Sequence, residues 1–151
     1  MDKKKFLQTE FIQLLEQLLP EQRGNWGKMN AQQMVEHMSE YLRIANGKKK
    51  MQPVLDEAIT QKMYAFMISE KPFRENTPNQ LLPEVPLPVK KSSMKEALEE
   101  LQNEINDFFE VYTNNPDLRN MSPFFGNLNF EEQVHLLHKH AMHHARQFGL
   151  V

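Results

Sequence analysis

Apolar residues recur at helical spacing along most of the chain. Residues 6–19 carry phenylalanine and leucine three and four positions apart, which predicts a helix that ends at Pro20. A second stripe begins after Asn30 and runs to Gly47; Gln33 lies three residues after Asn30, as in a capping box. A weaker helical pattern spans residues 53–68. These spacings favour helices over strands throughout the first half.

The second half carries two further helical patterns and one turn. Residues 92–115 follow a serine cap and end before Pro116, and residues 129–148 begin with a capping box formed by Asn129 and Glu132. Between them, the stretch MSPFFGNLNFEE is interpreted as a turn. We therefore predict an all-α fold: a single domain over residues 1–151, built as an up-down-down-up four-helix bundle.

Residues 71–91 form a long proline-rich segment between the two halves. Proline removes backbone donors and disfavours helix in the preceding residue, so this stretch is predicted to be an extended loop. It serves either as a crossover connection between helices or as a lid or partner surface. It holds five of the nine prolines: Pro72, Pro78, Pro83, Pro86 and Pro88.

Composition excludes several classes of function. The 151 residues are 40% hydrophobic and 25% charged, with a formal net charge of −2 and no basic stripe, so a nucleic-acid partner is not expected. No apolar run approaches the roughly 20 residues of a membrane span, and no signal-peptide core is present, so we expect a cytoplasmic protein without a membrane partner. The chain has no cysteine, which removes disulfides, thiolate ligands and a cysteine nucleophile.

The histidines gather near the end of the chain. Five of the six lie in residues 129–148, and His140 and His144 are one helical turn apart. At about 100° per residue, both share the apolar face of this helix. His143 lies to one side and His135 opposite, so both are expected in solvent, while His138 flanks the apolar face.

The sixth histidine, His37, lies in the apolar stripe of the second helix. A lone inward histidine is most often a satisfied core residue. An inward pair is harder to satisfy, because neutral rings need partners and protonated rings repel one another. We therefore predict that His37, His140 and His144 bind a divalent transition metal, with zinc or nickel favoured and copper or ferrous iron also suitable. Three ligands leave coordination positions open, and Tyr41 is either a pocket residue or packing.

Two stretches carry a resemblance to a known family: WGKMNAQQMVEHMSE at 26–40 and SPFFGNLNFEEQVHLLHKHAMHHARQFG at 122–149. They resemble the DinB/YfiT-like superfamily of metal-binding four-helix bundles, in particular an uncharacterised subgroup of it. The resemblance implies metal ligands at His37, His140 and His144. It also implies enzymes that transfer or isomerise with low-molecular-weight thiols. Ala145 and Arg146 depart from the arginine and glycine that many members have there, while Gln147 keeps its spacing.

The expected function is a metal-dependent transferase or hydrolase acting on a small-molecule substrate, with a low-molecular-weight thiol as a candidate cosubstrate. The catalytic acid and base are not identified. The alternative is a non-catalytic binding or interaction protein, dimeric, whose metal is structural or absent. A homodimer is left open in both cases.

Overall fold

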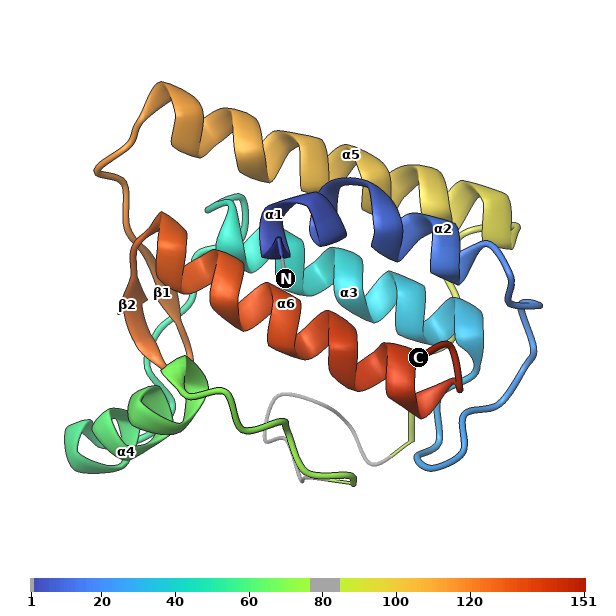
Figure 1. The fold of residues 1–151 in the computed structure, drawn as a ribbon, viewed down its shortest axis with the longest axis horizontal. Helices are drawn as coiled ribbons and strands as arrows, with labels where there is room; N and C mark the ends of the chain where they lie inside the picture. The colour runs from blue at the N-terminus through green and yellow to red at the C-terminus, as the bar shows by residue number, and fades with distance from the viewer. Residues whose placement is uncertain (1, 77–84) are drawn as a thin grey trace.

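The computed structural model describes residues 2–76 and 85–151 (Figure 1). The chain begins with one continuous helical segment, in which a π-helical turn, η1, lies between two short α-helices. Four longer helices follow, and a β-hairpin precedes the last of them. The elements are α1 (Lys3–Lys5), η1 (Phe6–Glu10), α2 (Phe11–Leu15), α3 (Ala31–Ala45), α4 (Glu57–Ile68), α5 (Met94–Asn114), β1 (Asn120–Ser122), β2 (Gly126–Leu128) and α6 (Phe130–Gln147).

The main hydrophobic core lies between the N-terminal helical segment, α3, α5 and α6. In Figure 1, α3 and α5 run in one direction, and the N-terminal segment and α6 run in the other. Apolar side chains at helical spacing from all four elements are buried there. The largest include Phe11, Leu15, Met34, Met38, Leu101, Phe108 and Leu137.

The predicted all-α four-helix bundle is wrong. The described residues form five helices, when α1, η1 and α2 are counted as one, and a two-stranded antiparallel sheet. The first helix also ends at Leu15, four residues earlier than predicted. The fold is therefore a helical core with an additional helix and a hairpin at one end (Figure 1).

The additional helix, α4, is the weak pattern seen at residues 53–68. Its only buried residue is Met67, and Ile59 and Ile68 are each 45% exposed. Met67 packs with Phe125 and Leu128 of the hairpin region in a second, smaller apolar cluster. The apolar residues of α4 are spread around the helix and do not form one apolar face, which explains both the weak sequence signal and its place outside the main core.

A hairpin at residues 120–128 occupies much of the stretch 121–132 that was predicted to be a turn. Each strand has three residues, too few to show the alternation by which strands are recognised. Gly126 has φ +95°, which favours glycine at the entry to β2. The Asn120 side chain donates to the carbonyl of Ala45 at 3.1 Å, and Gln133 donates to the Asn120 carbonyl at 3.3 Å. The hairpin thus ties the end of α3 to the start of α6.

The predicted capping boxes are confirmed at the starts of α3 and α6. The Asn30 side chain accepts from the Gln33 N–H at 2.8 Å, and the Gln33 side chain accepts from the Asn30 N–H at 2.8 Å. Asn129 and Glu132 make the same reciprocal pair, at 2.9 Å each. These caps fix where the two histidine-bearing helices begin.

A buried carboxylate holds α3 against α5. Glu104 on α5 is 8% exposed and accepts from Arg43 Nε at 3.0 Å and Lys48 Nζ at 2.7 Å. Asn46 donates to the same carboxylate at 3.2 Å. Every oxygen of this buried group therefore has a partner, as a buried charge requires.

The proline-rich segment is described at residues 71–76 and 85–91, and neither part contains a helix or a strand. Pro78 and Pro83 lie outside the described residues. The second part lies along α3, where the Gln33 side chain donates to the Leu87 carbonyl at 3.0 Å and Glu36 accepts from the Lys90 N–H at 2.7 Å. Of the helices that the structure describes, none is long and apolar enough to cross a bilayer.

Candidate metal centre

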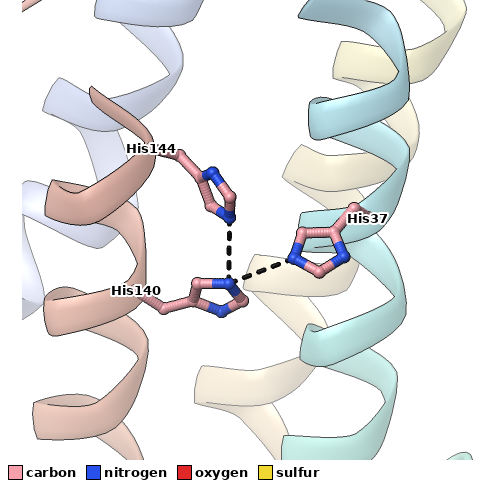
Figure 2. A group of neighbouring side chains, drawn as sticks. All are labelled: His37, His140 and His144. Carbon is pink, nitrogen blue, oxygen red and sulfur yellow. Dashed lines mark hydrogen bonds between the residues drawn. The ribbon is translucent and has the colours of Figure 1, made fainter. Parts of the chain in front are cut away.

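Three histidines from two helices meet between α3 and α6, as Figure 2 shows. His37 comes from the middle of α3, and His140 and His144 come from successive turns of α6. The Nε2 atom of His140 lies 3.1 Å from Nε2 of His37 and 3.0 Å from Nε2 of His144. One ring nitrogen from each residue lies within 4.8 Å of the other two. The three residues predicted from the sequence therefore form one cluster that can hold a metal ion.

Hydrogen bonds alone do not account for this cluster. A neutral imidazole nitrogen carries either one N–H or one lone pair, so it makes one in-plane hydrogen bond. The Nε2 atom of His140 can therefore form a hydrogen bond with Nε2 of His37 or with Nε2 of His144, but not with both. The other close nitrogen has no hydrogen bond with His140. A cation accepts lone pairs from all three rings at once. The donor set thus fits a metal ion better than it fits satisfied core histidines.

The two nitrogen separations at His140 agree with those between ligands of one metal ion. A zinc–imidazole bond is about 2.0–2.1 Å, so two ligand nitrogens are about 2.9 Å apart at a right angle and about 3.4 Å at the tetrahedral angle. The separations of 3.0 and 3.1 Å at His140 fall inside this interval. Because imidazole suits several divalent transition metals, the cluster does not select one of them.

Burial keeps the three rings neutral. It lowers the pKa of His37 from 6.5 to about 4, with a further lowering by His143 and an opposing effect of Glu40. The pKa values of His140 and His144 also lie well below 6.5, first because of burial and then because of repulsion within the cluster. At neutral pH, each ring therefore has a lone pair for a metal without first losing a proton.

The far side of the His144 ring is held by Gln147, one turn later on α6. The Nδ1 atom of His144 lies 2.7 Å from the side-chain oxygen of Gln147, and the Gln147 amide nitrogen donates to the Trp26 carbonyl at 3.0 Å. This contact was not predicted from the sequence. The signal that would have shown it is spacing, because residues three apart on a helix are neighbours.

The expectation that His135 and His143 face solvent is wrong, since both are half-buried. The His135 ring lies 2.8 Å from Lys3 Nζ and 3.0 Å from the Ser69 carbonyl. The His143 ring lies 5.7 Å from the Trp26 ring, and burial lowers its pKa. The end of α4 and the loop before α3 cover sides of α6 that four helices alone would leave open.

Two aromatic rings lie beside the cluster. The Tyr41 ring is 4.8 Å from the ring centres of His37 and His140, so the predicted neighbour of the site is next to it. Phe73, which follows α4, lies 6.2 Å from the His140 ring. Phe73 was missed because it stands in the proline-rich segment, where no periodicity marks an inward position. His37 and His140 are half-buried, whereas His144 is buried.

A buried lysine closes the C-terminal end of α4. Lys139 is 7% exposed, and its ammonium donates to the carbonyls of Phe66 at 3.0 Å, Ser69 at 2.8 Å and Lys71 at 2.6 Å. Burial lowers its pKa. A cation on the last carbonyls of a helix is favourable, and this one also fixes the segment after α4 against α6.

Comparison with known proteins adds no family to this geometry. The chain matches no protein-family model, and it has no significant match among curated proteins or solved structures. The capacity of the cluster to hold a metal ion therefore follows from its own residues and distances.

Proposed function

We propose that the protein binds a divalent transition metal through His37, His140 and His144 and uses it in a transfer or hydrolysis reaction on a small molecule. The observation that carries this proposal is the approach of two ring nitrogens to His140 Nε2, at 3.0 and 3.1 Å. Three ligands leave positions open for substrate, as catalytic rather than structural zinc sites do. The resemblance to the DinB/YfiT-like superfamily supports the same three ligands. Zinc and nickel are favoured because neutral imidazole suits both.

The chain's own residues supply binding and orientation. A bound zinc or nickel ion would act as a Lewis acid and lower the pKa of a water or thiol that binds it. The rings of Tyr41 and Phe73 lie beside His140, at 4.8 and 6.2 Å, and would border a substrate bound there. Because the chain has no cysteine, a thiol would have to arrive as substrate or cosubstrate. A low-molecular-weight thiol is the candidate that the family resemblance suggests.

Elemental analysis of extensively dialysed protein tests the metal site. The native protein should carry or take up about one equivalent of zinc or nickel, and His37→Ala and His140→Ala should each lose it. His135→Gln is the matched control, because it removes another half-buried histidine from α6 without touching the cluster. Native protein that stays metal-free after incubation with both ions would refute the proposal.

Cobalt substitution tests the thiol. Cobalt(II) bound in place of the native metal should develop a thiolate-to-metal absorption band when a small thiol is added. His37→Ala should show no such band. If the cobalt-loaded native protein shows no such band with added thiol, the thiol-dependent reaction is refuted and hydrolysis is the reaction that the proposal retains.

A second candidate is a non-catalytic protein that pairs with another copy of itself through α4. Ile59, 45% exposed on this helix, is the apolar side chain that such a contact would cover. A dimer in solution that dissociates when Ile59 is replaced by lysine, in protein that binds no metal, would support this candidate. A monomer at all concentrations would remove it.

A further inference from the structure

Gln147 lies behind the cluster with both ends of its amide engaged. It is 4% exposed, at the end of α6. Its side-chain oxygen lies 2.7 Å from His144 Nδ1, and its side-chain nitrogen lies 3.0 Å from the Trp26 carbonyl oxygen. The amide therefore connects the backbone of the loop before α3 to a ring of the candidate metal centre.

The Trp26 carbonyl decides how this amide is oriented. A carbonyl oxygen only accepts, so the end of the amide that faces it must be the NH2 group. The amide oxygen then faces His144, and since that oxygen also only accepts, His144 must carry its proton on Nδ1. A neutral imidazole has one N–H, so the Nε2 atom of His144 is left with a lone pair directed at His140 and His37 (Figure 2).

The loop at residues 24–27 fits closely around Gln147. The Asn25 N–H donates to the Gln147 carbonyl at 2.7 Å. A Cβ atom at Gly24 would lie 2.8 Å from Gln147 Cγ, and one at Gly27 would lie 2.6 Å from its side-chain nitrogen. Gly27 also has φ +79°, which glycine adopts readily. The two glycines thus let the loop approach closely enough to leave the amide one position.

We propose that Gln147 is a positioning residue: it fixes His144 as the Nδ1–H tautomer, so that the Nε2 lone pair is available to a metal. Within the described part of the chain, the outward ring nitrogens of His37 and His140 have no comparable partner, so this control is particular to His144. A ligand histidine whose second nitrogen is held in this way binds metal more tightly. The effect on affinity rests on the proposed metal site, whereas the tautomer is a property of the metal-free protein.

Three variants test the positioning role. Gln147→Leu removes both hydrogen bonds of the amide, while Gln147→Glu keeps an acceptor for His144 and loses the donor to Trp26. Gln133→Leu is the matched control: Gln133 is 1% exposed on the same helix, and its amide donates to the Asn120 carbonyl at 3.3 Å. The tautomer is read from the ring ¹⁵N shifts of His144 in metal-free protein near neutral pH, and affinity from zinc titration.

We expect His144 to be the Nδ1–H tautomer in the native protein and in the Gln147→Glu and Gln133→Leu variants. In Gln147→Leu the tautomers should mix, and zinc affinity should fall about 10- to 100-fold relative to the Gln133→Leu control. If Gln147 only anchored the loop, zinc affinity would fall equally in Gln147→Leu and Gln147→Glu, because both variants lose the hydrogen bond to the Trp26 carbonyl.

The positioning role is overturned if His144 keeps its tautomer in Gln147→Leu, or if the Leu and Glu variants lose the same affinity. Native protein that binds neither zinc nor nickel, but whose His144 tautomer changes in Gln147→Leu, would end the proposed function and leave the hydrogen-bond control of His144 standing. The two failures are therefore distinguishable.

Discussion

Two histidines should make the metal-free protein sensitive to mild acid. Burial lowers the pKa values of His37 and His138 from 6.5 to about 4 in the folded protein. Between about pH 4 and pH 6.5, these two histidines are protonated in the unfolded chain but neutral in the folded chain. The stability that the neutral rings contribute is therefore complete above about pH 6.5 and is lost as the pH falls toward 4.

The size of the effect follows from the same pKa values. For a histidine with an unfolded pKa of 6.5 and a folded pKa of about 4, the free energy of unfolding drops by about 2 kcal/mol between about pH 7 and pH 5. His37 and His138 together give about 4 kcal/mol. That is a large part of the roughly 5–15 kcal/mol that stabilises a typical domain.

Urea unfolding at several pH values, with a chelator present, measures this loss. His138 packs edge-on against Phe6 at 5.2 Å and lies outside the three-histidine cluster, so His138→Gln isolates the contribution of His138. Between about pH 7 and pH 5, the free energy of unfolding of the variant should fall by about 2 kcal/mol less than that of the native protein. A native protein whose stability is flat between about pH 7 and pH 5, or a variant with an unchanged slope, would refute the reasoning.

Three structural predictions follow from buried polar groups and backbone geometry. Lys139→Met should remove one donor from each of three carbonyls at the end of α4 and destabilise that helix by about 2–3 kcal/mol, seen as faster amide exchange in α4 but not in α5. Glu104→Gln should lower the free energy of unfolding by about 1–3 kcal/mol in urea titrations, because its two cationic partners lose a buried charge. Gly47→Ala should lower the melting temperature more than Gly149→Ala: both sites have positive φ, but only at Gly47 does the new Cβ lie 2.8 Å from a neighbouring side chain.

The metal cluster could be predicted because each part of it is local to one helix. The spacing of His140 and His144 places both rings on one face, and the apolar neighbours of His37 mark its face as inward. The capping boxes were equally local, since each depends on two residues three apart. The apolar faces of the two histidine-bearing helices were expected to pack together, because each apolar face needs a partner surface to be buried.

The features that were missed depend on contacts between distant residues. His135 is covered by the end of α4 and by Lys3, and neither can be placed by the periodicity of α6. Phe73 reaches the cluster from an irregular segment. The hairpin at residues 120–128 has strands too short for a pattern, and its place is fixed by the side chain of Asn120 on the end of α3.

Burial between α3 and α6 produces both the His37 part of the acid sensitivity and the readiness to bind metal. Burial keeps His37, His140 and His144 neutral, and it brings together more ring nitrogens than their hydrogens can link. Protons and a metal ion then compete for the same lone pairs. A metal that binds only the folded state adds about 2.7 kcal/mol at a hundredfold excess over its Kd, similar to what acid removes from one or two histidines. The cluster is therefore a costly arrangement for a metal-free core and a favourable one for a metal site, and this asymmetry supports the proposed binding of a metal.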